Sequence, residues 1–417
     1  MEWTLAFKIL SGFFFAIALL FLKNKFLGSR SRLPPGPPGL PVIGNFLDLG
    51  EMPHQSLANL RKKYGPVIWL RLGAVNTMVV SSAEAAMEMF KNHDLAFADR
   101  KTNEATSVHN YDQGSMVFAE YGPYWRMLRR ICTTELLTNN RINGTTNLRA
   151  NGVEKMTNWM WEEAQKNGTV EVARFVALGS FNVIGNVALS KDNIVEPQLK
   201  AGTEFFSSLT RAIELSAKPN LADFYPFLRF LDLQRIKKIS EEAMAHPLNF
   251  AAGFVKDRLL DRKNGRFNAK KDFLDVMLEF QGNQKDGEPA KIPQKKVNIM
   301  ILELFIASTH TTSSTIEWAM TELLRHPNIM SNVQAELDKV VGQKKVEESD
   351  IGNLHYLQAV VKETLSEAGF LAWMVAKFYE KSLHKYSGFI NIQIMAPGGN
   401  FVGFGFSLPE PDPELNF

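Results

Sequence analysis

The sequence contains a single cysteine, Cys132, among its 417 residues. One thiol cannot form an intramolecular disulfide, nor can it supply the several thiolates that a structural zinc site or an iron–sulfur cluster takes from one chain. Apart from His310, the histidines are scattered and show no spacing typical of metal ligands. The composition therefore excludes domains stabilised by intramolecular disulfides and domains with a Cys-rich metal site. It is consistent with a protein of a reducing compartment.

Neither sign of charge dominates, since 47 basic residues face 44 acidic ones for a net charge of +3. No lysine- or arginine-rich block in the folded part is long enough to follow a phosphate backbone, which argues against a nucleic-acid partner. There is also no internal repeat. With 45% hydrophobic residues, the chain can bury a core large enough for one big domain or two ordinary ones.

One apolar run, Trp3 to Leu22, is long enough to cross a bilayer and carries a single charge, Lys8. Basic residues follow it from Lys23, which favours an uncleaved anchor with the rest of the chain in the cytosol. We therefore predict an anchor at 1–22, then a basic, proline-rich hinge at 23–45 that spaces the next domain from the membrane. A buried helix or a cleaved leader is the alternative.

Most of the remaining chain is predicted to be helical, after a two-stranded hairpin that turns around Gly73 to Asn76. After Ser366 we predict one amphipathic helix up to Lys385 and then a disordered end. The predicted helices share a periodic apolar spacing. They are Ser82 to Lys91, Trp125 to Leu137, Gly152 to Gln165, Phe175 to Leu189, Gln198 to Ser216, Ile239 to Arg262, Phe273 to Phe280, Pro293 to Arg325, Ile329 to Val341 and Tyr356 to Leu365.

The longest predicted helix carries the hydroxyl-rich segment "ILELFIASTHTTSSTIEW", from Ile301 to Trp318. Serine and threonine side chains compete for the carbonyls of their own helix and tend to bend it. A bent, hydroxyl-lined helix could bind a small polar molecule. The alternative from the residues alone is a core helix that is simply rich in serine and threonine.

This helix resembles the oxygen-binding helix of the cytochrome P450 superfamily, the haem-thiolate monooxygenases. The family pattern Ala/Gly-Gly-x-Asp/Glu-Thr-Thr is matched from Ala307 to Thr312. The anchor with its "PPGPPG" hinge, "KYGPVIWLRLG", "FADR", "YGPYWRMLRRICTTELL", "KDFLDVMLE" and "LHYLQAVVKETL" also match. The segment "KPNLADFYPFLRFLD" resembles plant microsomal members near the geraniol-hydroxylase group. The resemblance covers roughly residues 1 to 365.

The resemblance implies roles for six residues. Trp125 and Arg129 match a W-x-x-x-R helix whose side chains hold a haem propionate, and their i, i+4 spacing puts both on one helical face. Ala307 and Ser308 line the oxygen groove, and Ser308 replaces the family's glycine, which adds a side chain where oxygen should fit closely. Thr311 matches the threonine that helps deliver protons to bound oxygen. His310 replaces the family's carboxylate, and we expect it to relay a proton near neutral pH.

The sequence departs from the family after Leu365. Glu363 begins the family's E-x-x-R pattern, but position 366 is serine, so we expect the glutamate to reach solvent or another base. No cysteine follows, although the family's haem iron takes a thiolate from a loop near the end of the chain. Cys132 is expected to be a small buried thiol. A gene-model error and a truncated isoform explain this abrupt change equally well.

We therefore predict an α+β, predominantly α, cytochrome P450 fold truncated in its C-terminal part. The partial catalytic domain spans 46–365, and 366–417 form a divergent tail. The resemblance implies haem b, O2, an NADPH-dependent cytochrome reductase and a small lipophilic substrate, with a terpenoid as one candidate. It also implies a single-pass protein of the endoplasmic reticulum membrane. Activity is expected to fail without the axial cysteine, and the alternative is a non-catalytic remnant held at the membrane.

Overall fold

The computed structural model describes residues 33–50, 52–198, 200–266, 271–366, 392–396 and 400–404. The predicted membrane anchor at 1–22 lies outside these residues, as does the predicted helix to Lys385 beyond Ser366. The chain divides into two compact units. The first comprises Met1–Lys101, Pro219–Gln234 and Tyr386–Phe417, and the second comprises Thr102–Lys218 and Arg235–Lys385.

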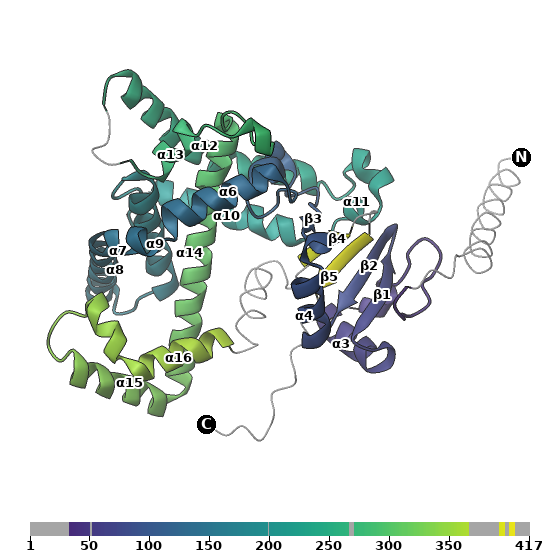
Figure 1. Cartoon of the computed structure of the whole chain (residues 1–417). Coiled ribbons are helices and arrows are strands. Elements are labelled where there is room, and N and C mark those ends of the chain that lie inside the picture. Colours follow the sequence, from purple (N-terminus) through teal and green to yellow (C-terminus); the bar gives the residue numbers. More distant parts are fainter. Residues whose placement is uncertain are drawn as a thin grey trace, which may run out of the picture. The chain divides into compact units, whose positions relative to one another are not determined.

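The first unit is built on a mixed sheet with the strand order β1-β2-β5-β4-β3 (Figure 1). The β2–β5 pair is parallel, and the other pairs are antiparallel. Its elements are α2 Phe46–Leu49, α3 Pro53–Tyr64, β1 Val67–Leu72, β2 Val75–Val80, α4 Ala83–Asn92, the 3-10 helix η1 Asp94–Phe97, β3 Asp99–Arg100, α11 Leu221–Phe224, the 3-10 helix η3 Pro226–Leu231, β4 Ile392–Ala396 and β5 Asn400–Phe404.

The predicted hairpin is confirmed, with Leu72 opposite Val75 across a two-residue turn. Gly73 in this turn has a φ of 61°, a conformation that favours glycine. A Cβ at this position would also lie only 2.8 Å from the ring of Tyr225. Alternate residues of β1, including Ile68 and Leu70, are buried, as expected for a strand with one face against a core.

Two strands of this sheet come from the part of the chain after residue 366, where the sequence predicts none. In β5, Phe401 pairs with Thr77 of β2 and with Met395 of β4. Phe401 and Thr77 lie more than three hundred positions apart in the sequence. Hydrophobic periodicity within one segment therefore could not have indicated the pairing.

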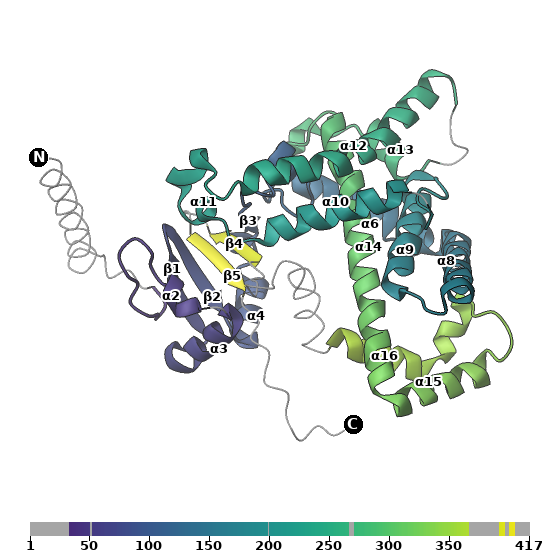
Figure 2. The ribbon, with the colours of Figure 1, turned by 180° about the vertical axis from the view of Figure 1, so that it is seen from behind.

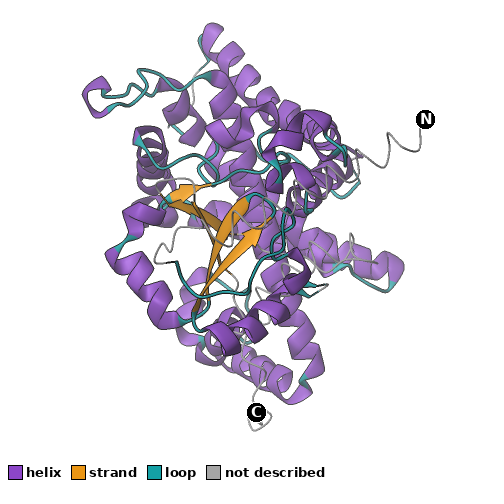
Figure 3. Ribbon diagram, turned by 90° about the vertical axis from the view of Figure 1, so that its right-hand side faces the viewer, coloured by secondary structure: helices purple, strands orange, loops and turns teal. Residues whose placement is uncertain are grey.

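The second unit is helical (Figure 3). All ten predicted helices are present, nine in this unit and one as α4 of the first unit. The largest difference at an end is in α8, which begins at Thr146 rather than Gly152. The elements are η2 Val108–Asn110, α5 Tyr111–Gly114, α6 Pro123–Leu136, α7 Asn139–Gly144, α8 Thr146–Asn167, α9 Val172–Leu189, α10 Lys200–Ala217, α12 Ile236–Lys263, α13 Phe273–Glu279, η4 Gln284–Asp286, α14 Gln294–Arg325, α15 Pro327–Val340, η5 Glu348–Asn353 and α16 His355–Ser366.

Helix α14 runs through this unit, from α12 and α13 near one end to α15 and α16 at the other (Figures 1 and 2). The core centres on aromatic side chains between α9, α10 and α14. Phe181 stacks on Phe305 with ring centroids 4.1 Å apart and meets the edge of Phe205 at 5.1 Å. Helix α9 is apolar and long enough to span a membrane, but half of it is buried in this core. The fold is thus predominantly helical with a small sheet, as predicted.

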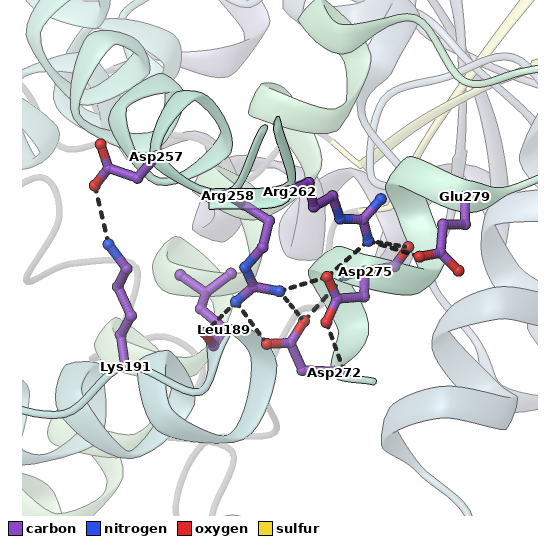
Figure 4. Close-up of polar contacts among 8 residues, drawn as sticks. All are labelled: Leu189, Lys191, Asp257, Arg258, Arg262, Asp272, Asp275 and Glu279. Atoms are coloured by element: carbon purple, nitrogen blue, oxygen red, sulfur yellow. Dashed lines mark hydrogen bonds and ion pairs between the residues drawn. The ribbon is translucent and has the colours of Figure 1, made fainter. Parts of the chain in front are cut away.

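A buried ionic cluster ties α9, α12 and α13 together (Figure 4). The Arg258 guanidinium donates to both carboxylate oxygens of Asp272 at 2.9 and 2.8 Å and to the Leu189 carbonyl at 2.8 Å. It also lies 2.7 Å from Asp275, which accepts a bond from Arg262 at 2.7 Å. Asp272 and Asp275 form the capping box of α13, so the cluster fixes where that helix begins.

Candidate active site

The predicted oxygen-side residues lie on one stretch of α14, in which Ser308 and His310 are partly buried. Ala307 and Thr311, one turn apart, are both exposed, and the Thr311 hydroxyl donates to the Ala307 carbonyl at 2.7 Å. The Ser308 hydroxyl likewise donates to the Phe305 carbonyl, at 3.4 Å. The hydroxyls therefore bond to the carbonyls of their own helix, as expected. The small side chains of Ala307 and Thr311 thus form an exposed surface on this face of α14.

His310 is partly buried on α14, and its burial lowers its pKa to about 4. The imidazole is therefore neutral at pH 7. This differs from the expectation of a histidine that carries a relayed proton near neutral pH. The residue type alone indicated a pKa near 6.5, whereas the packing around α14 removes the water that would stabilise the charged ring.

Trp125 and Arg129 lie one turn apart on α6, as their spacing predicted. The indole N–H of Trp125 donates to the Met116 carbonyl at 2.9 Å, and its ring lies 5.5 Å from that of Tyr121. The Arg129 side chain is exposed and makes no ion pair with another described residue. The guanidinium is thus accessible to a carboxylate ligand, while the single donor of the indole is committed to the main chain.

Glu303 joins α14 to the segment before α6, and the sequence analysis did not single it out. It is 5% exposed and accepts bonds from the Ser115 hydroxyl, the Met116 amide at 2.7 Å and the Val117 amide at 3.4 Å. Burial, and secondly this carboxylate, raises the pKa of Tyr111. The signal in the sequence was a lone acid in the apolar run "ILELFIA".

Comparison with known proteins decides the family. The model of the cytochrome P450 family matches residues 34–365. The chain belongs to the cytochrome P450 family.

Plant members of this family are similar to the chain over most of its length. Iridoid oxidase of Catharanthus roseus is 46% identical over 363 residues, which cover 85% of this chain and 70% of that protein. Cytochrome P450 76A2 of Solanum melongena is 44% identical over 371 residues, covering 88% and 73%. Geraniol 8-hydroxylase of Catharanthus roseus is 36% identical over 366 residues, covering 87% and 73%. The resemblance to the geraniol-hydroxylase group is thereby confirmed.

Cytochromes P450 are haem-dependent oxidoreductases whose iron takes a cysteine thiolate, and the residues present here do not fit such an iron. Cys132, the only cysteine of the chain, is 4% exposed within the helical core. Burial, and secondly the Glu303 carboxylate, raises its pKa to about 11. It is therefore a protonated thiol at neutral pH, as expected for a core residue, and no group of metal ligands occurs among the described residues.

Glu363 lies on α16 with an exposed side chain. The buried neighbour on this helix is Thr364, whose hydroxyl donates to the Val360 carbonyl at 2.8 Å. The family's glutamate–arginine pair cannot form at this spacing, because residue 366 is serine.

Proposed function

We propose that this chain is the scaffold of a cytochrome P450 monooxygenase that does not complete its own haem site. The observation that carries the proposal is the state of Cys132, a buried thiol on α6 that is the only cysteine in the chain. The oxygen-side face of α14 and the accessible Arg129 support descent from an active monooxygenase. As written, the chain does not activate oxygen.

The intact monooxygenase is proposed to hydroxylate a small lipophilic molecule of the terpenoid class, using O2 and electrons from an NADPH-dependent cytochrome reductase. The names of two relatives, iridoid oxidase and geraniol 8-hydroxylase, support this class. In this assignment Arg129 holds a propionate of the cofactor, and Trp125 lies beside it on the same face of α6, with its indole N–H donated to the Met116 carbonyl. Thr311 and the neutral His310 stand on the oxygen side, beside Ala307 and Ser308.

Exposed apolar side chains of the first unit support attachment to a bilayer. The proposed arrangement is a single-pass protein of the endoplasmic reticulum membrane with its catalytic part in the cytosol. Phe227 and Phe230 on η3 are 65% and 82% exposed, and Leu233 is 58% exposed. Val42, whose carbonyl accepts a bond from Tyr225 at 3.5 Å, is also exposed. Large apolar side chains gathered in this way are typical of a membrane or protein contact. In the sequence, the described part of this unit follows the apolar run Trp3 to Leu22.

The test is the absorption spectrum of reduced, CO-treated membranes that contain the full chain. We expect no Soret band at the position characteristic of thiolate ligation. If the chain shows such a band and Cys132→Ser retains it, the iron has an axial ligand other than Cys132. If Cys132→Ser loses the band, Cys132 leaves the core to bind iron. Either result would refute the proposal.

The second candidate function is a non-catalytic membrane protein that occupies the partners of its full-length relatives. The packed core around Phe181 and Phe305 favours it, because no residue of that core depends on an axial ligand for its packing. Coexpression with a full-length relative and a limiting amount of reductase distinguishes the two. A competing chain would lower turnover by the relative, and excess reductase would restore it.

A further inference from the structure

We propose that Glu303 is a positioning residue, which orients the Trp125 indole by fixing the segment Ser115–Phe118. This proposal rests on the proposed function, because Trp125 is one of the residues assigned to its cofactor site. The contacts run from Glu303 on α14 through this segment to Trp125 on α6.

The first step is the carboxylate itself. Three donors from one short segment converge on Glu303, namely the hydroxyl of Ser115 and the amides of Met116 and Val117. An ionised carboxylate only accepts hydrogen bonds and offers about four lone-pair sites, so it satisfies all three donors at once. Bonds of this charge-assisted kind are about twice as strong as neutral ones. The segment is therefore held chiefly by α14.

The second step is the rigidity of the segment. The Ser115 hydroxyl, while donating to Glu303, accepts bonds from the amides of Val117 and Phe118, both at 2.9 Å. The Ser115 amide donates to the Tyr111 carbonyl at 3.0 Å. Ser115 is fully buried, so water does not compete for these bonds. The orientation of the Met116 carbonyl thus depends on the hydrogen bonds that Ser115 and Met116 donate to Glu303.

The third step reaches the site. The Met116 carbonyl accepts the indole N–H of Trp125 at 2.9 Å. This carbonyl belongs to the same residue whose amide donates to Glu303, so the carboxylate and the indole bind two groups of one residue. The Trp125 ring lies on α6 one turn before Arg129. Glu303 therefore sets the indole orientation without touching it, and it is not a catalytic residue.

The test uses the full chain in detergent, labelled with ¹⁵N-tryptophan. The seven tryptophans yield seven indole N–H signals, and Trp125→Phe assigns the signal of Trp125. We compare wild type with Glu303→Gln, which keeps the side-chain size but turns an N–H donor toward the segment. Glu322→Gln is the matched control, because Glu322 lies on the same helix and pairs with Arg325 at 2.9 Å.

In Glu303→Gln we expect the Trp125 indole signal to shift and its exchange with solvent to rise about tenfold or more, the change that follows the loss of a charge-assisted bond. The other six indole signals should stay unchanged, and the control should match wild type. If Glu303→Gln does not fold, Ser115→Ala decides, and it should accelerate exchange of the same indole selectively.

The proposal is overturned if folded Glu303→Gln leaves the Trp125 signal as in wild type. It is also overturned if all seven signals change together, which would indicate a general loss of stability, or if Ser115→Ala, when needed, has no selective effect. The measurement needs no haem. Failure of the proposed function therefore shows in the CO spectrum, and failure of this inference shows in the indole exchange.

Discussion

Replacing Arg258 by methionine should destabilise the helical unit more than any exposed ion-pair substitution. Methionine keeps the length of the side chain but removes the donors to Asp272, Asp275 and the Leu189 carbonyl. Asp275 retains Arg262, whereas the Asp272 side chain, 4% exposed, loses its ion-pair partner in this cluster. Removing one member of such a buried pair costs about 3–5 kcal/mol, because the other charge stays buried.

The assay is pulse proteolysis of the full chain in increasing urea. The matched control is Arg266→Met, since Arg266 pairs with Asp261 at 2.8 Å but its side chain is 67% exposed. Exposed pairs contribute about 0–1 kcal/mol. Adding Asp272→Asn to Arg258→Met should recover part of the loss, because the buried carboxylate that paired with Arg258 is replaced by a neutral amide. Equal midpoints for Arg258→Met and Arg266→Met, or no recovery in the double variant, would refute the electrostatic account of this cluster.

Three further predictions concern acid stability, thiol reactivity and topology. Burial raises the pKa of Asp275, but hydrogen bonds from Arg262 and Arg258 have the larger effect and lower it. The stability that the ionised Asp275 contributes should therefore be complete above about pH 4 and be lost as the pH falls below that value. Urea titrations at a series of pH values measure this loss. Cys132, with a pKa raised to about 11, should resist maleimide at pH 7 in the folded chain and react in urea, and rapid labelling without urea would contradict its burial. The chain has two N-glycosylation sequons, Asn143-Gly144-Thr145 and Asn167-Gly168-Thr169, which stay unmodified in the cytosol. Glycosidase treatment should therefore leave gel mobility unchanged, whereas a shift abolished by Asn143→Gln or Asn167→Gln would place the domain in the lumen.

The helices could be predicted because their apolar residues recur with the period of a buried face, as in α9 and α14. Helix α3 was missed for the opposite reason, since only Pro53 and Leu57 of its residues are buried and the rest of "PHQSLANLRKKY" is largely polar. The sheet beyond the hairpin was missed because β2 pairs with β5, and nothing within either segment specifies so distant a partner.

The candidate site could be predicted in part. Matched motifs located Trp125, Arg129 and Thr311 on the helices where the structure has them, because the spacing within one helix is set by its 3.6-residue period. Two properties depend on tertiary burial and were beyond sequence reasoning. One is the low pKa of His310, and the other is the convergence of three donors on Glu303. Both require knowing what surrounds a side chain.

The most direct test of the central claim is one pair of reduced, CO-bound spectra. The first chain is the protein as written, and in the second, residues 366–417 are replaced by the corresponding C-terminal segment of iridoid oxidase from Catharanthus roseus. We predict no thiolate-type Soret band in the first chain and a clear one in the second, because the body up to Leu365 retains the scaffold. Turnover by the second chain should rise with His310→Asp and Ser308→Gly at constant haem content. A band in the first chain, or none in the second, would contradict the account.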